Sequence, residues 1–283
     1  MSTAGRGSRP ATPLAPRAWE QADLFSGRGT AGADDNAPER PPAVAPAALS
    51  DDALIAAIPV VAQAACRALA QEAVRRRLLA AVPALESLCR RFKGFGRDHT
   101  IAEQEAALRA MAALGGAEAI AAIRRIVVQD IVAGPGLPEA LRAAAALRCV
   151  LPEQTAAPLL RHADPAIRSL ACRCAPRSEQ TLALLASLLE DLNPGVAAEA
   201  AKALAHMGRS DGRPLLLRLL RQKPDAHLLA AVAAVADDEC TVWLGRVGLA
   251  HPALREAALE ALDSIETPRA AALRASLARF GVS

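Results

Sequence analysis

The pattern of apolar and polar positions divides the chain into two parts. Residues 1–48 show no apolar period and are rich in proline, glycine, serine and threonine, a composition typical of segments that form no core. From residue 49 onwards the chain alternates between stretches with helical apolar spacing and short turns. The pattern therefore predicts a disordered tail over residues 1–48 and a helical domain over residues 49–283.

Capping residues indicate where several of these helices begin. Ser50 precedes two aspartates, which suit the positive end of a helix dipole. The segment from Thr100 to Glu103 has the form of a capping box. Asp164 and Asn193 are each followed by proline, which combines an N-cap residue with a proline at the first helical position. These signals predict helix starts at four places along the domain.

The helix starts recur at a nearly constant interval. Five prolines are predicted to open helices, at steps of 27, 29, 30 and 28 residues: Pro138, Pro165, Pro194, Pro224 and Pro252. A period in this range is typical of stacked helical hairpins, and two helices of about 12 residues fit one step. A single hairpin cannot bury its own apolar face, whereas a row of hairpins can. The period therefore predicts a helical repeat protein.

The repeated segment reads D/N-P-x-h-R-x-x-A, where h is apolar, followed by a second apolar helix. It resembles the short HEAT-like repeats of the phycobilisome-lyase type over roughly residues 100–280. The likeness is clearest at Asp164–Ala175, Asn193–Met207 and His251–Ile265, whereas Ala197 and His227 depart from the arginine of the pattern. The resemblance implies an all-α fold, a right-handed α-α superhelix (HEAT-like solenoid) of about six hairpins. It leaves function open, because such repeats serve scaffolds, lyases, hydroxylases and DNA-binding proteins.

The amino-acid composition supports this fold. Hydrophobic residues make up 52% of the 283 residues, aromatic residues 2%, and tyrosine is absent. A core rich in alanine and leucine favours closely stacked helices.

The net charge of +3 requires no nucleic-acid partner. With no signal peptide and no apolar run long enough to span a membrane, we expect a cytoplasmic protein. Its six scattered cysteines are then expected to be buried thiols.

The candidate catalytic and metal-binding residues form no recognisable site. The five histidines are far apart, and none precedes a glutamate as in HEAT-like hydroxylases. Cys172 and Cys174 are two residues apart, so on a helix they face different directions. The sequence therefore predicts no metal, no cofactor and no enzyme, although an activity of the lyase or hydroxylase kind stays open as a third class.

A basic patch lies early in the helical domain. Residues 66–97 carry a net charge of +6, whereas the rest of the chain sums to −3. The patch residues singled out for anion or nucleic-acid contact are Arg75, Arg76, Arg77, Arg90, Arg91, Lys93 and Arg97. A structural explanation is also open, because cations near Gly94 complement a helix C-terminus and Phe92 and Phe95 can cover the end of the solenoid.

A short motif stands out in the tail. Gln21-Ala22-Asp23-Leu24-Phe25 resembles the pentapeptide through which bacterial polymerases and repair proteins dock on the sliding clamp. The resemblance implies that Leu24 and Phe25 fill an apolar pocket and that Gln21 and Asp23 bond around it. The alternatives are that the segment folds back onto the solenoid or binds another partner.

Two functions follow from these observations. The first is a non-enzymatic scaffold or adaptor that binds a protein partner through the solenoid. The second is a DNA replication or repair accessory protein, tethered to the sliding clamp by Gln21–Phe25 and touching DNA through residues 67–97.

Overall fold

The computed structural model describes residues 45–61 and 63–279, and within them it contains helices and no strand. The α-helices are α1 (Asp51–Ala57), α2 (Gln63–Arg75), α3 (Val82–Arg91), α4 (Ala102–Leu114), α5 (Gly116–Val128), α6 (Leu137–Ala146), α7 (Glu153–Leu160), α8 (Pro165–Arg173), α9 (Glu179–Ser187), α10 (Pro194–His206), α11 (Arg213–Gln222), α12 (Ala226–Ala234), α13 (Asp238–Ala250), α14 (Arg255–Asp263) and α15 (Pro268–Arg279). Seven 3₁₀ turns lie before and between them, namely η1 (Pro46–Ala48), η2 (Ile58–Val60), η3 (Leu79–Ala81), η4 (Gly134–Gly136), η5 (Leu188–Glu190), η6 (Ser210–Gly212) and η7 (Pro252–Leu254). The predicted tail up to residue 44, with its motif, lies outside the described residues.

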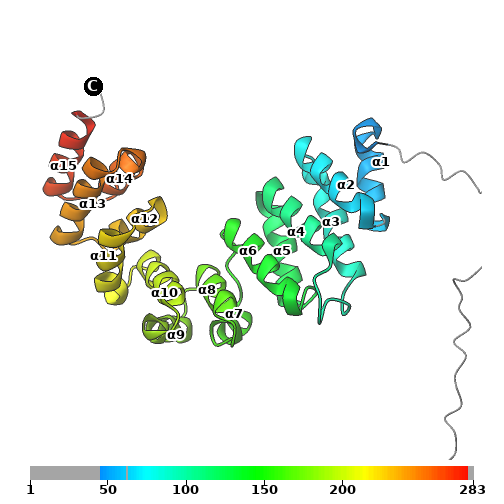
Figure 1. The fold of residues 1–283 in the computed structure, drawn as a ribbon, viewed down its shortest axis with the longest axis horizontal. Coiled ribbons are helices and arrows are strands. Elements are labelled where there is room, and N and C mark those ends of the chain that lie inside the picture. The colour runs from blue at the N-terminus through cyan, green and yellow to red at the C-terminus, as the bar shows by residue number, and fades with distance from the viewer. Residues whose placement is uncertain (1–44, 62, 280–283) are drawn as a thin grey trace, which may run out of the picture. The chain divides into compact units, whose positions relative to one another are not determined.

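The helices stack in two layers. The even-numbered helices from α2 to α14 pack in succession, each on the next even-numbered helix (Figure 1). In the other layer α3 packs on α5, α7 on α9, and α11 on α13, which also contacts α15. Each odd-numbered helix from α3 to α13 packs on the even-numbered helix that follows it, which forms the repeating hairpins. This arrangement confirms the all-α solenoid predicted from the sequence.

Most of the predicted helix starts are confirmed. The Ser50 side chain accepts a hydrogen bond from the Ala53 amide at 3.3 Å, and those of Asp164 and Asn193 cap α8 and α10 in the same way. Pro165 and Pro194 are the first residues of α8 and α10. Each of these helices is the second helix of its hairpin, after α7 or α9, whereas the repeat pattern placed the proline-initiated helix first. Three of the repeating prolines differ in detail: Pro138 is the second residue of α6, Pro224 precedes the cap residue of α12, and Pro252 begins η7.

The predicted capping box at Thr100 is wrong. Helix α4 begins one residue later, with Ile101 as its N-cap and no side-chain cap bond. Glu103, which would turn back in a capping box, is instead buried in α4 with 8% of its surface exposed. Because the packing of α4 takes up this side chain, the first-turn amides are left to other partners or solvent.

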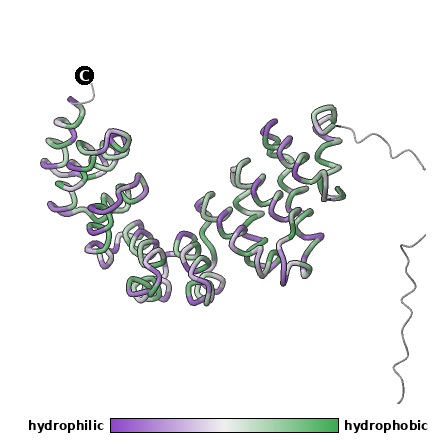
Figure 2. Tube along the Cα trace, viewed as in Figure 1, coloured by the Kyte–Doolittle hydropathy of each residue, from purple (hydrophilic) through white to green (hydrophobic). Residues whose placement is uncertain are grey.

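The core between the layers consists of leucine, isoleucine, valine and alanine in three clusters. The N-terminal cluster runs from Leu54 to Cys174, the middle cluster from Leu160 to Leu204, and the C-terminal cluster from Ala201 to Leu277. Hydrophobic and hydrophilic residues are interspersed along each helix, as expected when one face of the helix packs on the core and the other faces solvent (Figure 2). Each fully buried leucine or isoleucine contributes about 1.5–3 kcal/mol, so many small cores in series stabilise the fold.

The arginine of the repeat pattern has a structural role at α8. Arg168 donates from Nε and Nη2 to the Asp191 carboxylate at 2.8 and 2.9 Å. Its Nη1 donates to the carbonyls of His162 and Ala163 at 2.8 and 2.9 Å, just past the end of α7. The two bonds from Arg168 to the carboxylate hold the pKa of Asp191 below its usual value, with burial opposing them. One guanidinium thereby joins the end of α7, the helix α8 and the turn before α10.

Candidate interaction surface

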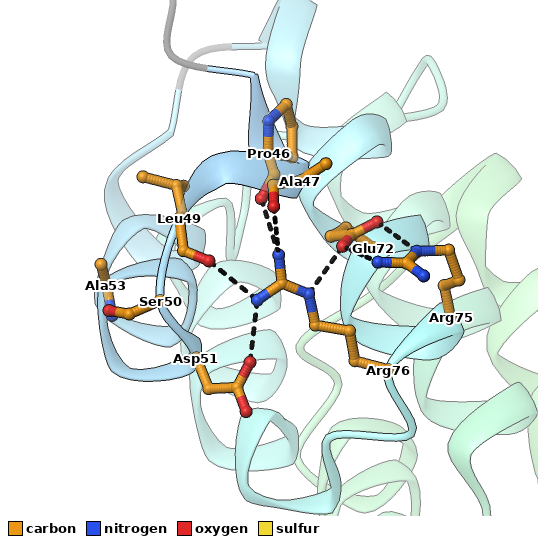
Figure 3. Close-up of polar contacts among 9 residues, drawn as sticks. All are labelled: Pro46, Ala47, Leu49, Ser50, Asp51, Ala53, Glu72, Arg75 and Arg76. Atoms are coloured by element: carbon orange, nitrogen blue, oxygen red, sulfur yellow. Dashed lines mark hydrogen bonds and ion pairs between the residues drawn. The ribbon is translucent and has the colours of Figure 1, made fainter.

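The seven cations predicted as an anion-binding patch have different environments. Arg76, which follows α2, is enclosed by the start of the helical region (Figure 3). Its guanidinium donates to the carbonyls of Pro46, Ala47 and Leu49 at 3.1, 3.0 and 2.8 Å and to the Asp51 carboxylate at 2.8 Å. Arg76 therefore fastens η1 and the first turn of α1 onto α2, and its donors face the protein.

Arg75 and Arg76 share the carboxylate of Glu72. Arg76 Nε donates to Glu72 Oε1 at 2.6 Å, and Arg75 donates to both Glu72 oxygens at 2.6 and 2.8 Å (Figure 3). The hydrogen bonds from Arg75 and Arg76 lower the pKa of Glu72 to about 2. Glu72 has 9% of its surface exposed, and its single carboxylate pairs with both arginines at the end of α2.

Arg90 and Arg91, at the end of α3, also have partners within the chain. The nearly buried Glu86 accepts from Arg90 Nη2 at 2.7 Å and from Arg125 Nη2 of α5 at 2.6 Å. Burial opposes ionisation of Glu86, but the bonds from Arg125 and Arg90 outweigh it and hold its pKa below the usual value. Arg91 donates to the Val61 carbonyl at 3.0 Å and stacks on the Phe92 ring. These contacts tie α3 to α5 and to the turn after α1.

The other three predicted cations project from exposed positions. Arg77, Lys93 and Arg97 are exposed and form no ion pair within residues 45–61 and 63–279. Lys93 and Arg97 lie on the loop of residues 92–101 between α3 and α4, together with Phe95, which is 68% exposed. Of the predicted patch, this loop and Arg77 are the parts that present free cations to a partner.

A groove lies between α2 and α4. It encloses about 320 Å³ and is lined by Arg67, Ala70, Gln71, Val74, Ala106, Arg109, Ala110 and Ala113. Alanine and valine form the apolar part of its lining, because small side chains on both helices leave the space between them open. Two arginines and a glutamine supply the polar groups.

The two arginines of the groove differ in availability. Arg109 donates from Nε to Glu139 of α6 at 2.7 Å and from Nη2 to Glu105 at 3.4 Å, so neighbouring carboxylates balance its charge. Arg67 is exposed and has no ion pair in the described part of the chain. An apolar floor beside one free guanidinium suits a ligand that joins an apolar group to a carboxylate.

The sequence contained a signal for this groove that charge counting missed. Ala106, Ala110 and Ala113 recur on one face of α4, and Ala70 and Val74 recur likewise on α2. The spacing identifies two small-residue faces, but sequence alone does not show that these faces meet.

No cluster with the chemistry of a metal site occurs among the described residues, where no three histidine, cysteine, aspartate or glutamate side chains gather to hold an ion. All six cysteines are buried free thiols, as predicted. Burial raises the pKa of the Cys172 and Cys174 thiols to about 12, far from the range of a reactive thiolate.

Comparison with known proteins agrees with the helical architecture. Residues 153–236, from α7 to just past the end of α12, match a family model described as HEAT repeats. A search of curated proteins returns no match. Across the described residues no helix combines the length and apolarity needed to cross a membrane. The match over this stretch and the stacked hairpins support a HEAT-like repeat architecture.

Proposed function

We propose that this chain is a non-enzymatic cytoplasmic scaffold that binds a protein partner through the α2–α4 groove. HEAT-like repeats commonly serve protein interaction, and the groove is the observation that carries the proposal. Six free cysteines suit a reducing compartment. The partner supplies a segment with an apolar anchor and a nearby carboxylate.

The groove has the dimensions for one or two partner side chains. Its volume of about 320 Å³ is at the low end of the range for ligand pockets. A peptide helix laid along it would place an apolar side chain against Ala106 and Ala110 and a carboxylate at Arg67. Binding in this mode buries apolar surface while Arg67 fixes the register through a charge-assisted hydrogen bond.

Photocrosslinking tests this proposal. With a photoreactive amino acid in place of Gln71, the full chain in its native cells is expected to crosslink to a discrete protein. Arg67→Glu and Ala113→Phe, which reverse the charge and fill the groove, are expected to reduce that crosslink at least about tenfold. Ala146→Phe is the matched control, because Ala146 is also an exposed alanine and lies on α6, outside the groove. A crosslink that survives groove filling, or none from position 71, would overturn the proposal.

The second candidate is the clamp-tethered DNA-maintenance protein, favoured by the resemblance of Gln21–Phe25 to a clamp-binding pentapeptide and by the free cations Arg77, Lys93 and Arg97. In this case a labelled peptide of residues 16–29 is expected to bind the bacterial sliding clamp with micromolar affinity in fluorescence polarisation. The doubly substituted peptide with Leu24→Ala and Phe25→Ala removes both apolar anchors and is expected to lose binding. Equal binding of the two peptides, or none at high clamp concentration, would rule out the tether.

A further inference from the structure

A second surface, remote in sequence from the groove, lies where α11 packs on α13. Trp243, the single tryptophan of the described residues, is half-buried on α13. The guanidinium carbon of Arg221, from α11, lies 4.7 Å from the centre of its ring, and that of Arg246, one turn further along α13, lies 4.9 Å away. One indole therefore contacts two arginines, one from each of two helices.

Cation–π contacts of this kind restrict flexible arginine side chains. Each contact orders the guanidinium before any partner arrives. A preordered arginine loses less conformational entropy on binding than a free one. Tryptophan and arginine are also the residues most often found at the energetic centres of protein interfaces.

The charges around Trp243 are unbalanced. Arg221 pairs with Glu239, one turn before Trp243 on the same face of α13. Arg246 is exposed, as is Arg218 one turn before Arg221, and neither has an ion pair within the described residues. Arg218, Arg221 and Arg246 are all exposed, and of the three only Arg221 has a carboxylate partner in the described part of the chain.

We infer that this α11–α13 surface, made of Arg218, Arg221, Trp243 and Arg246, binds an acidic segment of a partner protein. Carboxylates of that segment pair with Arg218 and Arg246, and its apolar side chains contact Leu249, which is 48% exposed. The ring holds two guanidinium groups within 5 Å of its centre, at 4.7 and 4.9 Å, so it is occupied where a nucleobase would stack. Charge complementarity therefore favours an acidic peptide over nucleic acid.

The surface is separate from the α2–α4 groove, so its test is independent of the proposed function. The full chain with Trp19→Phe retains Trp243 as its sole tryptophan, whose fluorescence reports binding at this surface. The probe is a labelled peptide of glutamate pairs separated by leucines, and polarisation measures its affinity. We expect saturable binding with a change in Trp243 fluorescence, and Arg218→Gln and Arg246→Gln are each expected to weaken it about five- to tenfold.

The matched control is Arg173→Gln, because Arg173 is an exposed arginine of α8 that lacks an ion pair in the described part of the chain. It removes the same charge elsewhere and is expected to leave the affinity unchanged. Helical circular dichroism of every variant checks that it folds. The inference fails if Arg173→Gln weakens binding equally, if the peptide does not saturate, or if a single-stranded oligonucleotide of equal charge binds as tightly.

Discussion

Replacing Gly134 with alanine is expected to lower the free energy of unfolding by about 2–5 kcal/mol, because backbone strain and overpacking act at one position. Gly134 begins η4 with a φ of +54°, a conformation that residues with a Cβ rarely adopt. A Cβ there would lie 2.3 Å from the Arg97 carbonyl oxygen and 2.8 Å from that of Gly96. Both neighbours are backbone, so the loop of residues 92–101 must move.

Chemical denaturation and hydrogen exchange measure this effect. Exchange is expected to accelerate in residues 92–101, because displacing the loop exposes its amides. Gly94→Ala is the matched control, since Gly94 has a φ of +88° in the same loop but no atom within 4 Å of an added Cβ. It carries the strain without the clash and is expected to cost only about 1–2 kcal/mol. An equal decrease in the free energy of unfolding for the two substitutions would show that the close approach of η4 to this loop does not contribute to stability.

Replacing Ile126 with alanine is expected to destabilise the N-terminal cluster by about 2–5 kcal/mol while the C-terminal cluster keeps most of its protection. Ile126 is fully buried in the N-terminal cluster, so truncation leaves a cavity. In a solenoid each hairpin contacts mainly its neighbours, so lost packing acts locally. Hydrogen exchange read by peptide mass spectrometry is expected to accelerate most in α3 to α6.

The reciprocal substitution is Leu244→Ala, at a fully buried position of α13 in the C-terminal cluster. Its effect is expected to fall on α11 to α15 and to spare α3 to α6. Together the two variants measure how far unfolding in one part of the solenoid spreads to the other. Uniform loss of protection in both variants would mean that the described domain unfolds as one cooperative unit.

Much of the fold follows from local sequence chemistry. Ser50, Asp164 and Asn193 cap helices because an N-cap side chain bonds amides two or three residues away, an interaction that sequence spacing specifies. The capping box at Thr100 has the same kind of pattern, yet burial of Glu103 takes precedence over it. Local signals thus predict helix starts, except where a side chain that would form the cap is buried by packing between helices.

The candidate surfaces were harder to predict, because they depend on which helices meet. Arg76 and Arg90 are similar cations in the sequence, but one binds carbonyls up to 30 residues earlier in the chain and the other shares Glu86 with Arg125 of α5. A charge count cannot distinguish such arginines from Arg97, which has no ion pair in the described residues. Nor can it place Arg221 beside Trp243, since that contact requires α11 to pack on α13.

The bonds of Arg168 also bear on how the solenoid would respond to mechanical load. Tension along the stack pulls neighbouring hairpins apart, and the pair between Arg168 and Asp191 crosses one such boundary. In the next repeat Ala197 takes the place of the arginine, and α10 and α12 share no ion pair within the described residues. Apolar contacts yield over short extensions, whereas a bidentate ion pair must break two directed bonds at once. The boundary between α10 and α12 is therefore expected to yield more readily under load than the boundary between α8 and α10.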